Sequence, residues 1–219
     1  MNSSDFVAQL LEENTEILKR LQPKETLEAD VGKSINMVAL LKAALRNEME
    51  AIEIAALWIP DTAEPDIKLA LARQTGDEAK HYRLIKERLA NLGEDPSISP
   101  AEAPPKTKLF GYLSSLSTSI ERAAAGQFTR EHIAMVKNDQ FVNYCKEVND
   151  TETLAMYQDI ICPDEEYHHL LGKTILEKYA TSDELQEQAR AASLQTLHLA
   201  EEMQRVASEI LGTGRGPGC

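Results

Sequence analysis

Turn-forming and aromatic residues are scarce in this chain. Its 219 residues include 10 glycines and 9 prolines, and aromatic residues make up only 5% of the composition. A β-rich domain of this size would need many turns, and its strands would be enriched in aromatic side chains. No stretch shows strand-like alternation over a useful length. We therefore predict an all-α fold, and the chain is long enough to bury a sizeable core.

The sequence also shows no disulfide framework and no membrane-spanning run, and we expect no secretory leader. Its three cysteines, Cys145, Cys162 and Cys219, show no CxxC spacing. No apolar run approaches the about 20 residues of a membrane span. The first residues, "MNSSDFVAQLLEENTE", contain neither a basic region nor a long apolar core. We expect an intracellular, cytoplasmic protein.

Positive charge is in short supply. Lysine and arginine together number 23 against 36 aspartates and glutamates, which gives a formal net charge of −13. Such a chain would repel phosphate groups, so we expect no binding to nucleic acid or to an anionic membrane. Most of the acidic residues are expected to lie on solvated helix faces.

Apolar residues recur at three- and four-residue spacing over most of the chain, which is the pattern of amphipathic helices. Pro60 is expected to end the second helix, and Asp61 with Glu64 resembles a capping box ahead of the third. Gly126 and the start-like "FTRE" leave open whether the fourth is one helix or two. The predicted helices cover about residues 3–22, 34–58, 65–92, 109–148, 151–180 and 182–211.

One long connection separates the middle helices into two pairs. Gly93–Lys108 contains four prolines and little to bury, so it predicts a connection rather than a regular element. The outermost helices each carry one apolar stripe and either cover the bundle or form a dimer seam; we expect a homodimer. The predicted organisation is one helical domain (1–211), with a core bundle (about 34–180), flanking helices (about 3–22 and 182–211) and a flexible tail (212–219).

Glu-x-x-His occurs twice in predicted helices. Residues three apart lie on one helix face, so such a pair can converge on a metal ion. Because acidic residues are abundant, about one pair is expected by chance among five histidines. The sequence contains Glu78-x-x-His81 and, in "CPDEEYHHLL", Glu165-x-x-His168. The overlapping Glu166 and His169, one register later, are an alternative to the second pair.

An additional glutamate lies level with each pair. Glu48 lies 12 residues before Pro60 and Glu78 lies 13 after Pro65, so an antiparallel hairpin would place both about 18–20 Å from the turn. On the other hairpin, Glu131 lies 18 residues before Asn149 and Glu165 lies 16 after it. The candidate metal ligands are Glu48, Glu78, His81, Glu131, Glu165 and His168.

This set matches the ligands of di-iron and di-manganese carboxylate bundles, in which two helices give Glu and two give Glu-x-x-His. Four carboxylates balance the charge of two divalent ions, and two neutral imidazoles complete the set. Without metal, four buried carboxylates would be costly and would have to take up protons.

Four short stretches resemble a known family. "NEMEAI" (Asn47–Ile52), "DEAKHYRLIKERLANLGEDP" (Asp77–Pro96), "REHI" and "PDEEYH" resemble the four ligand-helix motifs of bacterioferritins and rubrerythrins, which belong to the ferritin-like superfamily. The resemblance covers about residues 34–180. It implies a ferritin-like four-helix bundle with a long crossover between helices 2 and 3 of the bundle. It also implies that Glu78 bridges two metal ions and that His81 is a terminal ligand.

The sequence departs from these families in several places. No rubredoxin-like cysteine pairs are present, so an external electron donor is expected. Ala79 stands where bacterioferritins place a haem-binding methionine, so we expect no haem, and Ala55 stands where relatives often have tyrosine. Pro163, two residues before Glu165, either kinks the fourth ligand helix or marks its true start. The helix at 182–211 is longer than a ferritin cage's terminal helix, which argues against a 24-subunit shell.

The resemblance and the ligand chemistry imply a di-iron carboxylate oxidoreductase. Two iron ions, or manganese or a mixed pair, would activate O2 or peroxide to oxidise iron or a small organic substrate. One alternative is an iron storage or detoxification protein with ferroxidase activity, which would need a large hollow assembly. A second alternative is a helical interaction protein with a vestigial metal site.

Overall fold

The computed structural model describes residues 1–21, 36–95, 105–211 and 217. Within these ranges every regular element is a helix and no strand occurs, which confirms the all-α prediction for this part of the chain. None of these helices is both long and apolar enough to cross a membrane. The helical elements are α1 (Ser3–Leu21), α3 (Met37–Asp61), α4 (Pro65–Asn91), α5 (Lys108–Ser115), α6 (Ser119–Arg122), η1 (Ala123–Arg130), α7 (Glu131–Glu147), α8 (Thr151–Met156), η2 (Tyr157–Ile161), α9 (Cys162–Tyr179) and α10 (Asp183–Leu211).

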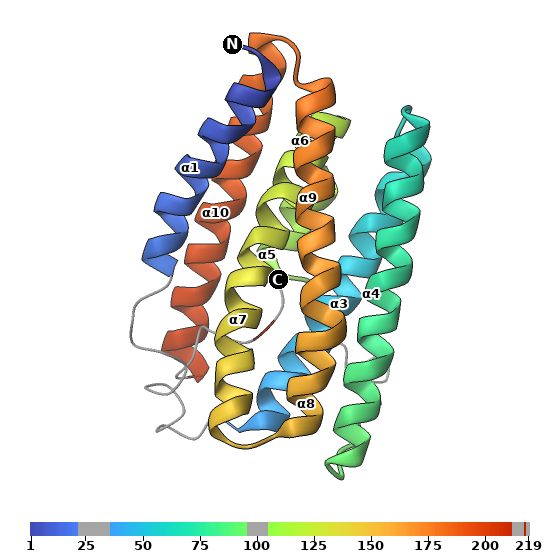
Figure 1. The fold of residues 1–219 in the computed structure, drawn as a ribbon, viewed down its shortest axis with the longest axis vertical. Helices are drawn as coiled ribbons and strands as arrows, with labels where there is room; N and C mark the ends of the chain where they lie inside the picture. Colours follow the sequence, from blue (N-terminus) through green and yellow to red (C-terminus); the bar gives the residue numbers. More distant parts are fainter. Residues whose placement is uncertain (22–35, 96–104, 212–216, 218–219) are drawn as a thin grey trace.

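The helices α3, α4, α7 and α9 run side by side through the molecule (Figure 1). The helices α3 and α9 rise in this view, whereas α4 and α7 descend. The chain leaves α4 at the lower end and enters α6 near the upper end, so the connection that includes α5 spans the height of the molecule. The outer helices α1 and α10 lie together and pack against η1 and α9.

The α3–α4 hairpin differs from the prediction at its turn. Pro60 was expected to end this helix, but it lies inside the last turn of α3, which continues to Asp61. The predicted capping box is wrong, because Asp61 is the last residue of α3 and Glu64 is the N-cap residue of α4 without a side-chain capping bond. Pro65 does begin α4, where a missing N–H costs no hydrogen bond.

The connection from α4 to α5 is tied to α3 at the end that the structure describes. Gly93, with φ of +84°, follows Leu92, the C-cap residue of α4. The Arg46 guanidinium donates to the Pro105 carbonyl, and the backbone N–H of Thr107 donates to the Glu50 carboxylate at 3.1 Å. Glu50 is only 8% exposed, and its carboxylate anchors the connection.

The third long segment is one continuous helical path through α6, η1 and α7. Thr118 caps it with Glu121 in a capping box. The "FTRE" stretch does not start a helix, because it lies where the π-helix η1 passes into α7. The N–H of Glu131 donates to the carbonyl of Gly126, five residues earlier, and so closes the last wide turn.

The fourth long segment also contains a π-helix. The elements α8, η2 and α9 follow one another from Thr151 to Tyr179, and the side chain of Asp150 caps the first. The N–H of Cys162 closes the wide turn on the carbonyl of Tyr157, and Pro163 follows immediately. Because the hydrogen-bond ladder changes period here, the proline is accommodated without ending the helical path.

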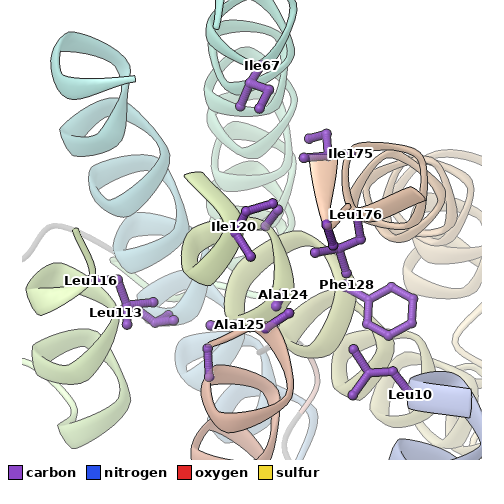
Figure 2. Packing of buried hydrophobic residues seen from close by; sticks show 14 of the residues in the cluster. Leu10, Ile67, Leu113, Leu116, Ile120, Ala124, Ala125, Phe128, Ile175 and Leu176 are labelled. Carbon is purple, nitrogen blue, oxygen red and sulfur yellow. The ribbon is translucent and has the colours of Figure 1, made fainter. Parts of the chain in front are cut away.

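The apolar core is divided by height into two main clusters. On each of the four long segments, one cluster occupies the turns above the predicted ligands and the other the turns below them. The upper cluster contains Trp58, Leu71, Phe128 and Leu176, and part of it is shown in Figure 2. The lower cluster includes Leu45, Ile85, Phe141 and Ile161. A layer of polar side chains therefore separates two hydrophobic layers.

The contact between α9 and η1 depends on a glycine. A Cβ atom on Gly172 would lie 2.7 Å from the backbone carbonyl carbon of Gln127 and closer still to the backbone of Phe128. These are backbone atoms, so neither can move aside cheaply. The absence of a side chain at Gly172 is what lets α9 approach the π-helix that precedes Glu131.

We predict that Gly172→Ala lowers the free energy of unfolding by about 1–3 kcal/mol, because the methyl group overpacks this contact. Gly76→Ala is the matched control, since Gly76 lies inside α4 with nothing within 4 Å of its added Cβ. That change should be neutral or stabilising by up to about 1 kcal/mol. Urea denaturation followed by circular dichroism measures both; equal effects would contradict the account.

Candidate metal centre

The structure gathers all six predicted ligands in the polar layer between the two apolar clusters. One glutamate comes from α3, one from α7, and a glutamate with a histidine comes from each of α4 and α9. Every one of these side chains is buried, with 0–3% of its surface exposed. The gathered residues are Glu48, Glu78, His81, Glu131, Glu165 and His168.

The cluster consists of two overlapping groups, in each of which the ligand atoms lie within 4.8 Å of one another. One group adds Glu48 and His81 to a shared pair of glutamates, and the other adds Glu131 and His168 to the same pair. The shared residues are Glu78 and Glu165. Each of these two carboxylates therefore belongs to both of the four-residue groups that could hold a metal ion.

The shifted alternative pair lies elsewhere. Glu166 is exposed and lines a groove of about 490 Å³ between α7 and the η2–α9 segment. His169 stacks on the Phe128 ring, and its Nδ1 lies 2.7 Å from the Phe128 carbonyl. Neither residue belongs to the cluster, so the geometry favours Glu165 and His168.

Each histidine of the cluster turns one ring nitrogen inward and the other toward an aspartate. His81 Nδ1 lies 3.2 Å from Glu78 and 3.5 Å from Glu48, whereas its Nε2 lies 3.0 Å from Asp164. A hydrogen bond from Nε2–H to this carboxylate would orient the ring and leave Nδ1 free to bind a cation.

His168 is arranged in the same way, with the histidine on α9 and the aspartate on α4. Its Nδ1 lies 3.5 Å from Glu78 and 3.9 Å from Glu165, and its Nε2 lies 3.3 Å from Asp77. Each aspartate thus immediately precedes the shared glutamate of one helix and contacts the histidine of the other. The two motifs are linked reciprocally across α4 and α9.

Sequence reasoning missed Asp77 and Asp164, although the signal was present. Both motifs read Asp-Glu-x-x-His, in "DEAKH" and in "DEEYH". Lys80 also contributes, because its ammonium lies 2.5 Å from Asp164 and 3.7 Å from Asp77. Burial opposes ionisation of Asp164, but the Lys80 and His81 hydrogen bonds hold its pKa below the ordinary value. Asp164 is therefore suited to accept a hydrogen bond from the His81 imidazole.

The pKa values of the cluster indicate that its buried carboxyl groups have too little positive charge around them. Burial raises the pKa of Glu48 and of Glu165 to about 7, and it raises the pKa of Glu131 well above the ordinary value. His81, between two glutamates, has its pKa raised to about 12 despite burial. Without a cation the site therefore holds protons on groups that would otherwise be carboxylates or neutral imidazole.

Two inward-facing atoms have no hydrogen-bond partner among the described residues. These atoms are Glu165 Oε2 and His168 Nδ1, which are fully buried and 3.9 Å apart. A buried polar atom without a partner is costly, and a bound cation between the two would satisfy both. The residues present therefore fit a metal ion, and oxygen and imidazole donors suit iron or manganese.

A comparison with protein-family models gives no matching family, and comparisons with curated proteins and with solved structures give no match either. The assignment of a function therefore depends on the geometry and chemistry of the cluster.

We predict that the metal-free protein loses stability as the pH rises from 5 to 8. Glu48 and Glu165 have a folded-state pKa of about 7 against an ordinary 4.5, so their contribution is present below about pH 4.5 and lost as the pH rises through 7. The raised pKa of His81 acts in the same direction above its ordinary value of 6.5. Urea midpoints measured with a chelator at each pH test this.

The double variant Glu48→Gln, Glu165→Gln tests whether these two carboxyl groups cause the pH dependence. Its midpoint should depend less on pH over this range than that of the wild type. A wild-type midpoint that is constant or rises with pH would show that the carboxyls are not held protonated by burial.

A second prediction concerns the two aspartates. Asp77→Asn and Asp164→Asn should each weaken metal binding about 10- to 100-fold, because the neutral amide no longer orients and polarises the imidazole. Titration against a competing chelator measures the affinity. Asp159→Asn, at an exposed position of η2, is the control and should bind like the wild type. Unchanged affinity in both site variants would refute the role of the aspartates.

Proposed function

We propose that the protein is a ferritin-like di-metal carboxylate oxidoreductase that uses two iron ions to activate O2 or peroxide. The observation that carries the proposal is the sharing of Glu78 and Glu165 by two groups of potential ligands. A single-ion site would need only one such group. Chance clustering of acidic residues would not place two buried glutamates between two buried histidines.

The arrangement of the helices supports the ferritin-like part of the proposal. Two antiparallel hairpins, α3–α4 and α7–α9, supply the ligands, and the connection between them spans the height of the molecule (Figure 1). A ferritin-like bundle has such a crossover, with Glu and Glu-x-x-His ligands projecting inward from facing helices. In this reading α1 and α10 are additions that cover one side of the bundle.

The charge of the cluster favours two divalent ions. Four carboxylates would neutralise two such ions, and the raised pKa values of Glu48, Glu131 and Glu165 show that the protein alone does not supply this compensation. When bound, a pair of iron ions supplies two-electron redox chemistry toward O2 or peroxide, for the oxidation of iron or of a small organic molecule.

The chain's own residues have distinct roles in this proposal. Glu78 and Glu165 would be ligands common to both ions, and Glu48 and Glu131 would each complete one of the two groups. To bind a cation through Nδ1, His81 would release the proton there to solvent and keep the proton at Nε2, which it would donate to Asp164. The hydrophobic layers above and below exclude bulk water, which strengthens the electrostatic interactions within the site.

The groove between α7 and the η2–α9 segment offers an approach for a small molecule. Met135, Val136, Cys162 and Pro163 give it an apolar part, and it lies one helical turn from Glu165. Burial raises the pKa of the Cys162 thiol in the groove lining to about 11, and the charge of Glu165 acts in the same direction. We place the approach of a small oxidant or substrate here.

Metal stoichiometry tests the proposal. The wild type should bind two ferrous ions per chain under anaerobic loading. Glu78→Ala and Glu165→Ala should each lose most binding at both positions, because each removes a ligand that both ions share. Glu48→Ala should retain about one ion, since it affects only one group.

The matched control is Glu166→Ala, which changes a neighbouring exposed glutamate and should still bind two ions. Fewer than about one ion in the wild type would defeat the proposal. A wild type and a Glu78→Ala variant with equal metal content would indicate instead a helical protein without a functional centre.

A further inference from the structure

Three polar side chains are buried together where the outer helices meet the third long segment. Asn14, Thr129 and Ser193 are 2%, 0% and 0% exposed, and none of them belongs to the metal cluster. Asn14 comes from α1, Thr129 from η1 and Ser193 from α10. Burying polar groups is costly unless they are paired, so the partners of these three side chains show what they do.

The three side chains close a ring of hydrogen bonds. Asn14 Nδ2 donates to Thr129 Oγ1 at 3.1 Å, and Ser193 Oγ donates to Asn14 Oδ1 at 2.8 Å. Because a hydroxyl has one hydrogen, Thr129 Oγ1 is then the donor in the 2.7 Å contact with Ser193 Oγ. Turning the Asn14 amide over would reverse the direction of the ring and keep it closed. Each member of the ring therefore donates one bond and accepts one.

The ring is a single polar layer in an apolar seam between three helical segments. Four residues before and four residues after each member stands a buried apolar side chain. These six residues are Leu10 and Leu18, Ala125 and Ile133, and Ala189 and Leu197. One polar layer in such a seam specifies the alignment of the helices, because any other alignment would leave its members buried without partners.

Fixing Thr129 also fixes the direction of Glu131. Thr129 contacts the outer helices, whereas Glu131, two residues later, lies in the metal cluster. Two residues are about 200° apart around an α-helix, and somewhat less in the wider turn of a π-helix. A rotation of this segment about its axis would therefore move both side chains, and holding Thr129 against α1 and α10 holds Glu131 toward the cluster.

The segment that carries Thr129 depends on tertiary contacts. It is a π-helix of eight residues, whereas π-helices are rare and occur mostly as single turns. On the α9 side it is held by the close approach at Gly172 and by the contact of His169 with the Phe128 carbonyl. The ring provides the corresponding attachment on the side of the outer helices.

We propose that the ring of Asn14, Thr129 and Ser193 fixes the rotation of the η1–α7 segment and so places Glu131 in the metal layer, with Thr129 as the positioning residue. The outer helices α1 and α10 then support the metal centre in addition to covering the bundle. This inference rests on the proposed di-metal function and adds to it the elements that set one of the two ligand groups.

The test compares two substitutions of one residue. Thr129→Val keeps the shape of the side chain and removes its hydroxyl, whereas Thr129→Ser keeps the hydroxyl. Anaerobic titration with ferrous iron against a competing chelator measures each binding step without reference to activity. Thr129→Val should weaken one step by about tenfold or more and leave the other unchanged, because Glu131 belongs to only one ligand group. Thr129→Ser should restore the weakened step.

Thr196→Val is the matched control. Thr196 is also 0% exposed, and its hydroxyl donates to the carbonyl of Ala192 within α10, outside the ring. The control should lower the urea midpoint of the metal-free protein and leave both binding steps as in the wild type. A loss of binding equal to that of Thr129→Val would reveal a general effect of destabilisation and would overturn the inference.

The triple variant Asn14→Leu, Thr129→Val, Ser193→Ala separates stability from positioning. It replaces the whole polar layer by apolar side chains and leaves no member unpaired, so its urea midpoint without metal should equal or exceed that of the wild type. It should nevertheless bind one ion as weakly as Thr129→Val does. A stable triple variant that binds both ions like the wild type would show that the ring only joins the helices, and would refute the proposal.

The other outcomes also decide the question. Thr129→Ser with binding as weak as that of Thr129→Val would assign the effect to the methyl group and overturn the role of the ring. Thr129→Val with a wild-type titration would refute the role of Thr129 while the di-metal function stands. A wild type that binds fewer than two ions would overturn the di-metal function, and this inference with it.

Discussion

The constraint on which the structure depends is the burial of four carboxylates and two imidazoles in one layer of the protein interior. Isolated charges in such a place cost many kcal/mol, so each group must be protonated, paired or bound to a cation. The pKa values divide the cluster accordingly. Glu78 is held ionised, because the hydrogen bond to His81 and the charges of His168 and His81 outweigh its burial, whereas Glu48 and Glu165 are raised to about 7. The surrounding aspartates and Lys80 can be understood as responses to this constraint.

Both π-helices lie next to the polar layer that contains the cluster. The first ends immediately before Glu131, and the second ends a few residues before Glu165. A wide turn inserts an extra residue into the helical register, and such turns occur frequently at functional sites. Here they set the direction of two ligand-bearing faces, and Gly172 permits the close packing that holds the first in place. The buried hydrogen bonds of Thr129 with Asn14 and Ser193 attach the same π-helix to α1 and α10.

Much of the cluster could be predicted from the sequence because its signal is periodic. Two Glu-x-x-His pairs and two glutamates at matching distances from the turns are sufficient to place six residues at one height. The aspartates, the hydrogen-bonded ring and the π-helices were not predicted. Hydrogen bonds such as that between Asn14 and Thr129 join residues 115 positions apart and have no local pattern. A π-turn arises from packing, and propensity carries little information about it; the "FTRE" stretch therefore resembled a helix start and Pro163 resembled a break.

The most direct measurement is anomalous X-ray scattering at the iron absorption edge from crystals prepared with ferrous iron. The account predicts two peaks about 3.5–4 Å apart, both within coordinating distance of Glu78 and Glu165. One peak should adjoin His81 and the other His168. A single peak in the cluster, or peaks only at exposed carboxylates, would contradict it.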